Sequence, residues 1–424
     1  MNILLLGSGG REHAFAHKIV QSPRCGQLFI APGNAGTAEI GRNVALSPND
    51  FPAIGRFVLD NAVGLVVVGP EEPLVNGIWD YFRADPALKG IPLVGPSREG
   101  ARLEGSKAYA KAFMIESGIP TAAYREFVRG EQEAAFAFLE TLSPPYVIKA
   151  DGLAAGKGVV IPETLEKARE ELKSLLDGRF GAASERVVVE EFLRGIEFSV
   201  FVATDGRSWV ILPEAKDYKR VGEGDTGPNT GGMGAVSPVP FADEALMEKV
   251  RKRIVEPTIA GLQRRGIEYR GFVFAGLMNV GGDPYVIEYN CRMGDPETEV
   301  VMPRLESDLL ELLIATGAGM LAGKRVETDP RAAATVVAVS GGYPESYEKG
   351  FPITGVESLD PDALLFHMGT TQKNGELVTQ GGRVLAVTAF GKSITEAATN
   401  AQSQQANIQF EGKYLRRDIG YEFP

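Results

Sequence analysis

The 424-residue sequence has few of the side chains that build disulfides, metal clusters or membrane spans. Two cysteines, Cys25 and Cys291, exclude a disulfide framework and a cysteine metal cluster. Of three histidines, His13 and His17 lie one helical turn apart, but a third metal ligand is not apparent near them. No apolar run is long enough to span a membrane, and the N-terminus lacks the basic flank and cleavage site of a secretory signal. We therefore expect a cytoplasmic protein without a membrane partner.

Positive charge is also in deficit, since 44 Lys and Arg face 55 Asp and Glu and give a net charge of −11. This balance argues against a nucleic-acid-binding surface, although basic pockets can still hold small anions. The length predicts two to four globular domains. Glycine is abundant instead, with 51 residues concentrated in loops where backbone amides can approach phosphates.

The first hundred residues alternate between strands and helices. Apolar strands are predicted at 2–6, 28–31, 64–68 and 91–94, each followed by a Gly- or Pro-rich loop. This order predicts a doubly wound parallel α/β domain that binds ligands at the carboxyl ends of its strands. The loop before the first helix predicts an anion site, but Glu12 stands where a dinucleotide fingerprint requires glycine, which disfavours a dehydrogenase.

The middle of the chain places lysines beside a glycine-rich loop. A predicted strand at 145–150 carries Lys149, and the loop after it contains Gly152, Gly156 and Gly158. Such a loop suits a flap whose amides cover a polyphosphate that the lysine neutralises, with a plain hairpin turn as the alternative. It is not a P-loop, because Gly158 occupies the position that requires Ser or Thr. Lys107, in a helix predicted to run to Ser117, is a second candidate, although a solvated helix lysine is the simpler interpretation.

Two further stretches have the composition of binding segments. Residues 186–197 form an apolar strand and an exposed link to the next strand, and they offer an apolar slot, backbone donors and carboxylates for an adenine nucleotide; many interdomain linkers would do the same. Residues 222–234 form a long glycine-rich stretch that we predict to be a structureless substrate loop, entered by Lys216, Lys219 and Arg220.

The stretch 284–297 contains the strongest metal candidate. Residues 285–290 read as a strand, so Glu288 and Asn290 share one face. A carboxylate and an amide oxygen are ligands that Mg²⁺ accepts while keeping sites for water and phosphates. Arg292 follows as a fixed cation, and the strand at 271–280 should pair with this one. An ordinary edge strand with a solvated face is the alternative. After residue 331, further strands and a helix at 393–407 carry no catalytic constellation, and His367 is predicted to be structural.

Taken together, the motifs resemble the ATP-grasp ligases over essentially the whole chain. The resemblance rests on GSGGREHA (7–14), APGNAGT (31–37), VGPEEPL (68–74), LEGSKA (103–108), VIKADGLAAGKGV (147–159), VEEFLRGIEFS (189–199), KDYKRVGEGDTGPNTGGMGA (216–235) and VIEYNCRMGDPETE (286–299). It implies an N-terminal domain at 1–103, an ATP-grasp body at 104–325 with a mobile lid at about 121–190, and a C-terminal β-rich domain at 326–424. The fold class expected is thus mixed α/β and α+β.

The resemblance also implies an activity, in which ATP, glycine and 5-phosphoribosylamine give glycinamide ribonucleotide, ADP and phosphate through glycyl phosphate, in purine synthesis. Phosphoryl transfer needs positioning and charge neutralisation rather than a nucleophilic side chain, so no catalyst is missing. The remaining open alternatives are another ATP-grasp carboxylate–amine ligase or carboxylase, and a non-catalytic nucleotide sensor. No protein partner is implied, and we expect a monomer.

By matching positions, the resemblance assigns roles to individual residues. It assigns the binding of the metal, Mg²⁺ or Mn²⁺, to Glu288 and Asn290. It assigns stabilisation of the reacting groups to Arg292, Lys149 and Asp217. It assigns ATP binding to Lys107, Lys149, Gly152, Gly156, Gly158, Glu190, Phe192, Leu193 and Glu197. It assigns the binding of phosphoribosylamine and glycine to Gly9, Gly10, Arg11, Asn34, Gly36, Thr37, Glu72, Lys219, Thr230, Gly231 and Gly232.

Two departures from the family pattern matter. Ile196 replaces the first of two acidic residues that usually follow Gly195, so the ribose falls to Glu197 alone. The strand at 274–277 lacks the metal ligand that many ATP-grasp enzymes take from it, so a second metal would rely on Glu288, Asn290 and phosphate oxygens.

Overall fold

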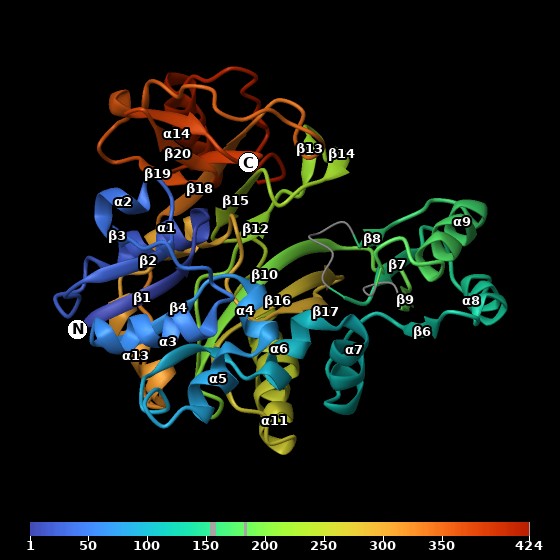
Figure 1. Cartoon of the computed structure of the whole chain (residues 1–424). Helices are drawn as coiled ribbons and strands as arrows, with labels where there is room; N and C mark the ends of the chain where they lie inside the picture. The colour runs from blue at the N-terminus through green and yellow to red at the C-terminus, as the bar shows by residue number, and fades with distance from the viewer. Residues whose placement is uncertain (153–157, 182–184, 424) are drawn as a thin grey trace.

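The computed structural model describes residues 1–152, 158–181 and 185–423. An N-terminal α/β layer packs against a central body, a lid projects from one side of that body, and a C-terminal domain lies above both in the view of Figure 1. Within the described residues, no helix is long and apolar enough to cross a membrane. The mixed α/β architecture that we predicted is confirmed.

The N-terminal layer is a parallel sheet covered by helices. Its strands are ordered β3-β2-β1-β4-β5, all parallel to their neighbours. The strands are β1 (Asn2–Gly7), β2 (Leu28–Pro32), β3 (Arg42–Asn43), β4 (Val63–Val68) and β5 (Leu93–Pro96). The helices are α1 (Gly10–Ile19), α2 (Thr37–Ile40), α3 (Phe51–Asp60), α4 (Glu71–Asn76), α5 (Ile78–Ala84) and α6 (Arg98–Gly105). Buried Ile, Leu and Val run through the central strands, as expected of a sheet covered on both faces.

The central body continues the same sheet. Strand β16 (Tyr269–Val280) pairs antiparallel with β5 through Tyr269 and Pro96, so that nine strands form one sheet. Its other strands are β10 (Ile196–Thr204), β11 (Trp209–Ile211) and β17 (Asp283–Asn290), and β16 pairs with β17 as predicted. The helices are α7 (Lys107–Glu116), α10 (Glu244–Val250), a π-helical turn (Arg251–Val255), α11 (Glu256–Arg264), α12 (Thr298–Arg304) and α13 (Leu309–Ala318).

The predicted helix around Lys107 is divided. Helix α6 ends at Gly105 and α7 begins at Lys107, because Ser106 has extended backbone and its side chain accepts a hydrogen bond from Tyr109 N at 3.1 Å. A serine in this position is a standard N-cap. The break places Lys107 at the first turn of a new helix.

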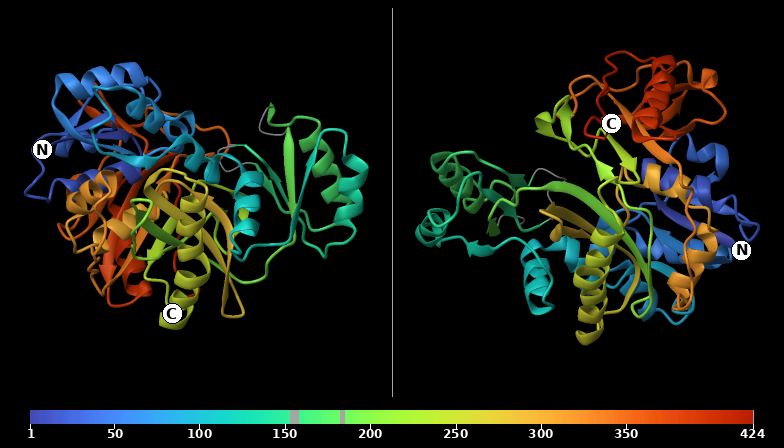
Figure 2. Two further views of the ribbon diagram at one scale, coloured as in Figure 1. Left: turned by 90° about the horizontal axis from the view of Figure 1, so that it is seen from below. Right: turned by 180° about the vertical axis from the view of Figure 1, so that it is seen from behind.

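The lid has a separate core. Its four-stranded antiparallel sheet, ordered β6-β9-β7-β8, packs against two helices and buries its own cluster, including Ile148 and Leu172. Its elements are β6 (Tyr124–Val128), α8 (Gln132–Leu139), β7 (Val147–Ala150), β8 (Val159–Val160), α9 (Leu165–Leu176) and β9 (Arg186–Glu190). In both views of Figure 2 the lid extends to one side of the rest of the molecule.

The C-terminal domain is built on a five-stranded antiparallel sheet that residues from the middle of the chain complete. Strands β12 (Lys216–Asp217) and β15 (Gly234–Ser237) join it in the order β12-β15-β18-β22-β19. The other elements are β18 (Ala332–Val339), a 3₁₀ turn (Val356–Ser358), β19 (Leu364–His367), β20 (Thr370–Lys373), β21 (Glu376–Thr379), β22 (Arg383–Gly391) and α14 (Ile394–Asn407). Residues 216–237 therefore connect the central body to this domain.

The prediction of a structureless loop at 222–234 is wrong. Strands β13 (Arg220–Gly222) and β14 (Thr226–Asn229) form a hairpin beside the C-terminal domain, seen at the right of that domain in Figure 1. Gly224 and Asp225 have φ of 63° and 55°, so the turn uses the left-handed conformations that glycine and aspartate tolerate. The glycine-rich composition marked a tight turn rather than disorder.

Candidate active site

Glu288 and Asn290 are placed by a β-bulge in β17. Gly276 pairs with Glu288 and Leu277 with Val286, so Ile287 is the extra residue. The Ile287 carbonyl accepts a hydrogen bond from Lys149 Nζ at 3.1 Å, which ties the lid strand β7 to the central body. Beyond the bulge, Glu288 and Asn290 alternate with buried Tyr289 and share one face, as predicted.

Cations surround the Glu288 carboxylate. Lys219 Nζ lies 3.9 Å from Glu288 Oε1 and also forms an ion pair with Glu197. Burial alone would raise the pKa of Glu288, but Lys219, Lys149 and Lys107 outweigh it and hold the pKa below its usual value. The carboxylate is therefore ionised at neutral pH, as a hard-metal ligand must be.

The donor set fits a metal shared with phosphates. Within the described residues, no group of three or more His, Cys, Asp and Glu could hold a metal ion. One carboxylate and one amide oxygen, which here accepts a hydrogen bond from Arg292 Nη2 at 3.3 Å, are too few for an all-protein cage. They match the way Mg²⁺ binds through one or two protein oxygens together with substrate phosphates.

A buried ion triad lies where lid and body meet. Lys149 Nζ and Lys111 Nζ each lie 3.1 Å from Glu190 Oε2. The other carboxylate oxygen, Glu190 Oε1, is buried and has no hydrogen-bond partner among the described residues. Such an oxygen is costly unless a ligand supplies a donor, and the exocyclic amine of adenine is a donor of this kind.

Lys111 was missed by the sequence reasoning. It is 2% exposed, and its Nζ also donates to Thr121 Oγ1 at 2.7 Å, beside the first strand of the lid. Burial lowers its pKa to about 8, although Glu190 opposes the shift. Its spacing of one helical turn from Lys107 was the available signal.

The other nucleotide candidates lie along the same edge. Lys107 Nζ donates to the Gly152 carbonyl at 3.1 Å, and burial lowers the pKa of Lys107. Phe192 and Leu193 occupy the link between β9 and β10, and Glu197 follows it at the start of β10. Gly158 adjoins β8, whereas Gly156 lies outside the described residues.

Arg292 is held by carboxylates that the sequence reasoning did not select. Its Nη2 lies 2.8 Å from Glu104 Oε1, and its Nε lies 3.5 Å from Glu71 Oε2. Burial alone would lower the pKa of Arg292, but Glu104 and Glu71 outweigh it and raise the pKa. Glu72, the predicted residue, is exposed one position after Glu71.

The loop after β1 is organised by Glu12. Its carboxylate accepts hydrogen bonds from Gly9 N and Arg11 Nε, both at 2.7 Å. A Cβ on Gly69 would lie 2.0 Å from Glu12 Oε1, so the acid fills the space that a dinucleotide site would leave open. Arg11 N also donates to Asp295 Oδ2 at 3.3 Å, which joins this loop to the segment after β17.

The loop after β2 is closed by the C-terminal domain. Asn34 Nδ2 donates to the His367 carbonyl at 2.7 Å, and Asn34 and Thr37 bond each other through side chain and backbone. A Cβ on Gly36 would lie 2.3 Å from His13 Cε1, so only glycine fits there. His13 Nδ1 accepts a hydrogen bond from His367 N, and burial lowers the pKa of His13 to about 3 and of His367 to about 4. The polar groups of Asn34 and Thr37 thus hold the loop in shape, and both histidines are neutral structural groups.

Between these loops lies an acid-rich end, of which the sequence reasoning selected Asp217 alone. Asp295, Glu297 and Glu299 face Arg383, whose Nη1 lies 2.9 Å from Asp295 Oδ1 and donates to the Gly231 carbonyl at 2.8 Å. Burial and the neighbouring Asp217 raise the pKa of Glu297 to about 8, and burial and Asp295 raise the pKa of Glu299 well above its usual value. We call Asp217, Asp295, Glu297 and Glu299 the acidic end of the site.

The predicted residues of the 216–235 motif adjoin this end. Thr230 N donates to the Lys219 carbonyl at 2.7 Å, and a Cβ on Gly232 would lie 2.3 Å from Pro296 Cδ. Burial raises the pKa of Asp217, although Lys219 opposes the shift. The structure thus brings together the lysines of α7 and the lid strand β7, the Glu288–Asn290 pair of β17 and the acidic end, with Lys219 between them.

Comparisons with known proteins address the family to which this chain belongs. Family models of phosphoribosylglycinamide synthetase match in three parts: the N domain at residues 1–104, the ATP-grasp (A) domain at 105–298 and the C domain at 333–422. A phosphoribosylamine–glycine ligase from Vibrio cholerae is 47% identical over 99% of this chain and 98% of its own length. The crystal structure of a Thermotoga maritima phosphoribosylamine–glycine ligase superposes with a TM-score of 0.86, at 38% identity over 99% of this chain and all of its own.

A more distant structure shares the fold alone. The biotin carboxylase domain of a Hydrogenobacter thermophilus 2-oxoglutarate carboxylase, solved with MgADP and bicarbonate, has a TM-score of 0.71 at 15% identity, covering 97% of this chain and 91% of its own. The full-length matches at much higher identity decide between the ATP-grasp branches. The chain belongs to the phosphoribosylglycinamide synthetase family and is an ATP-dependent carbon–nitrogen ligase.

Proposed function

We propose that the chain joins glycine to 5-phosphoribosylamine, giving glycinamide ribonucleotide, ADP and phosphate in purine biosynthesis, with ATP at the lid edge and the amine at the acidic end. The observation that carries this arrangement is the position of Lys219, which contacts Glu288 on the metal strand and Glu197 at the nucleotide edge, while its carbonyl holds Thr230 beside the acidic end. The family membership supports the reaction itself.

The nucleotide is held by the lysine-rich edge. Glu190 Oε1 accepts the adenine amine, the Phe192–Leu193 backbone completes the base contacts, and Glu197 binds the ribose. Lys107, Lys149 and the loop that contains Gly152 and Gly158 neutralise and cover the phosphates. Ile196 is 45% exposed at this edge, and its aliphatic side chain offers no polar contact to the ribose.

A divalent cation, Mg²⁺ or Mn²⁺, supplies charge neutralisation of the β- and γ-phosphate oxygens when bound. Glu288 and Asn290 would hold it. The related fold solved with MgADP supports a magnesium nucleotide as the substrate.

The reaction then proceeds by a phosphoryl transfer and a glycyl transfer, which the protein side chains assist. A glycine carboxylate oxygen attacks the γ-phosphorus, the bond to the bridging oxygen breaks, and ADP leaves; Lys149 and Arg292 stabilise the charge on the transferring group. The amine of phosphoribosylamine next attacks the glycyl carbonyl, and phosphate leaves with the oxygen that came from glycine. The acidic end receives the amine, and Asp217 accepts the proton that the nitrogen loses.

The proposed working unit is a monomer. The loops that carry Gly9, Gly10 and Arg11 and that carry Asn34, Gly36 and Thr37 form the wall against which the phosphoribosyl group rests. Glu72, Thr230, Gly231 and Gly232 line the approach to it.

The test is ADP release at fixed ATP and Mg²⁺, with glycine and freshly made phosphoribosylamine added singly and together, for the wild type and for Glu288→Ala. Release that needs both substrates and is lost in the variant supports the ligase and its metal site. Release with bicarbonate or formate in place of glycine would favour another ATP-grasp branch. No release under any combination would favour a nucleotide sensor.

A further inference from the structure

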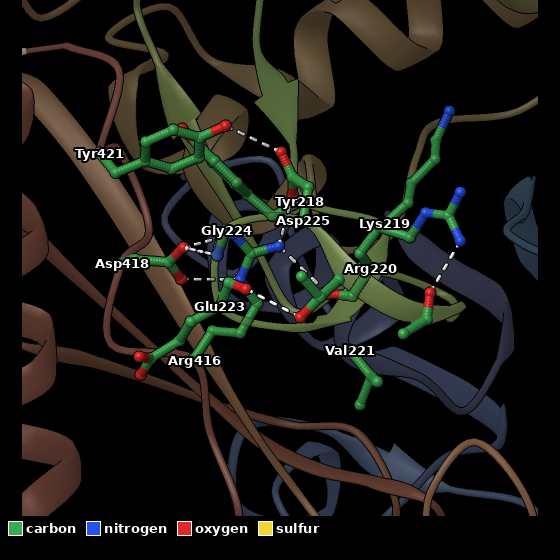
Figure 3. Close-up of polar contacts among 12 residues, drawn as sticks. Tyr218, Lys219, Arg220, Val221, Glu223, Gly224, Asp225, Arg416, Asp418 and Tyr421 are labelled. Carbon is green, nitrogen blue, oxygen red and sulfur yellow. Dashed lines mark hydrogen bonds and ion pairs between the residues drawn. The ribbon is translucent and has the colours of Figure 1, made fainter.

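The C-terminal segment 414–422 closes around the hairpin β13–β14, and Arg416 is at the centre of that contact (Figure 3). Arg416 is fully buried, and its guanidinium forms two parallel ion-pair bonds to Asp418, Nε to Oδ1 and Nη2 to Oδ2, both at 2.8 Å. Its Nη1 lies 2.7 Å from Asp225 Oδ1 and donates to the Arg220 carbonyl at 3.1 Å. This single side chain thus joins the C-terminal segment 414–422, here called the tail, to the start of β13 and to the turn before β14.

Neighbouring groups fix the same hairpin. Gly224 N donates to Asp418 Oδ2 at 2.7 Å, and Tyr421 OH donates to Asp225 Oδ2 at 3.0 Å. Tyr414 OH donates to the Val221 carbonyl at 2.9 Å. All of these contacts reach the hairpin from residues that are nearly 200 positions later in the chain.

The tail also fixes the residue on the other side of Lys219. Tyr218 is 1% exposed, donates from its hydroxyl to Glu422 Oε2 at 2.7 Å and lies under the Arg416 guanidinium at 5.2 Å. Lys216 pairs with Glu422 at 2.8 Å and lies over the Tyr218 ring at 3.9 Å. Lys219 is therefore bounded by Tyr218 and Arg220, and the tail holds both.

We propose that Arg416 is a positioning residue for the ligation reaction, acting through Tyr218 and Arg220 to fix Lys219 between Glu197 and Glu288. The inference rests on the proposed function, because it takes Lys219 to be part of the reaction site. Arg416 contacts Asp418, Asp225 and the Arg220 carbonyl rather than Lys219 itself, and a buried fork held by two carboxylates is rigid enough to transmit position.

The test compares Arg416→Gln with Arg417→Gln, since Arg417 is the exposed neighbour and its side chain lies outside the network. We expect Arg416→Gln to lower kcat/KM for glycine on the order of 10- to 100-fold, because a displacement of about 1 Å can cost that much. The dissociation constant of MgADP should change less than kcat/KM for glycine, because the adenine contacts come from α7, β7 and β9 and only Glu197 and Glu288 adjoin Lys219. Arg417→Gln should leave both quantities unchanged.

A double-variant cycle separates positioning from a general loss of stability. If Arg416 acts through Lys219, Arg416→Gln combined with Lys219→Met should lose no more activity than Lys219→Met alone. Additive losses, or MgADP affinity that falls in parallel with activity in Arg416→Gln, would overturn the inference while the ligase assignment stands. Full activity in Lys219→Met would instead remove Lys219 from the proposed site, and the role of Arg416 with it.

Should Arg416→Gln not fold, Tyr421→Phe provides the same test, because it removes only the hydroxyl that holds Asp225. The expected result is a smaller fall in kcat/KM for glycine, with a still smaller change in MgADP affinity. An unchanged kcat/KM in Tyr421→Phe, beside an Arg416→Gln that does not fold, would show that the network serves stability alone and would overturn the inference.

Discussion

The two ends of the site differ in their charge balance. At the nucleotide edge, Lys111 and Lys149 share the single carboxylate of Glu190, and Lys107 lies near Lys149. At the acidic end, the carboxyl groups of Asp217, Asp295, Glu297 and Glu299 lie close together beside Arg383, and Glu297 and Glu299 keep their protons to higher pH than usual. The nucleotide edge thus has a positive charge that a polyphosphate would neutralise, whereas the acidic end has carboxyl groups that can exchange a proton with an amine. Lys219 lies between them and contacts Glu197 and Glu288.

The strongest way to break the comparison is to remove Glu288, the carboxylate proposed to bind the metal where the two ends meet. Glu288→Gln should lower kcat on the order of 1,000-fold, because an amide cannot supply the charge that draws the metal to the transferring phosphoryl group. Steady-state ADP release measures it. Asp283→Asn, at the start of the same strand and exposed, is the matched control and should keep kcat near the wild-type value.

The nucleotide edge is tested by removing one of its lysines. Lys111→Met should weaken MgADP binding about tenfold, since Glu190 then keeps only Lys149 and its unpartnered oxygen is less well directed. Isothermal titration calorimetry gives the dissociation constant, with Lys167→Met on the exposed face of the lid helix α9 as the control. KM for glycine should change little, and an equal loss for both substrates would contradict the separation of the two ends.

The acidic end is tested by its protonation. The pKa of Glu297 is raised from 4.5 to about 8, so the folded state holds a proton that the unfolded state releases between these pH values. The free energy of unfolding contributed by this group therefore falls as pH rises from about 4.5 to 8, by about 1.4 kcal/mol for each unit of pKa shift at most. In urea unfolding, the free energy of unfolding of Glu297→Gln should rise relative to that of the wild type between pH 5.5 and pH 8. A difference that is constant with pH would mean that Glu297 is ionised in the folded state.

The smallest effect is expected outside both ends. Arg24 and Glu311 form an ion pair at 2.8 Å with half of the arginine side chain exposed. Solvent screens such a pair, so Arg24→Ala should change the free energy of unfolding by less than about 0.5 kcal/mol and leave kcat unchanged. A larger loss would mean that charge pairs matter throughout the molecule and not only at the site.

Much of the fold could be predicted because its signals are local. The strands of the N-terminal layer, the pairing of β16 with β17 and the shared face of Glu288 and Asn290 follow from apolar runs and a two-residue period. The hairpin at 220–229 was missed because its two strands are short and exposed, and its contacts come from Arg416 and Asp418, far along the chain. Composition alone does not reveal such long-range partners.

The site was predicted less evenly than the fold. Motif matching selected Lys149, Glu288 and Arg292, which the structure brings to one region. It did not reveal that Lys111 pairs with Glu190 or that Glu104 pairs with Arg292. The spacing of residues along a helix does not distinguish a buried lysine or glutamate from a solvated one. Asn34 and Thr37 lie at the predicted place, but their polar groups bond within their own loop and to the C-terminal domain. The domain boundaries at 103 and 325 and the individual substrate roles stay predictions.

The central claim is that the two ends cooperate through an activated glycine. The most direct measurement uses glycine labelled with ¹⁸O in both carboxylate positions and follows the mass of the phosphate released with both substrates present. The account predicts one ¹⁸O atom in each phosphate and one retained in glycinamide ribonucleotide, because the attacking oxygen leaves with the phosphoryl group. Phosphate without label, formed together with product, would contradict the acyl phosphate and the arrangement of the two ends around it.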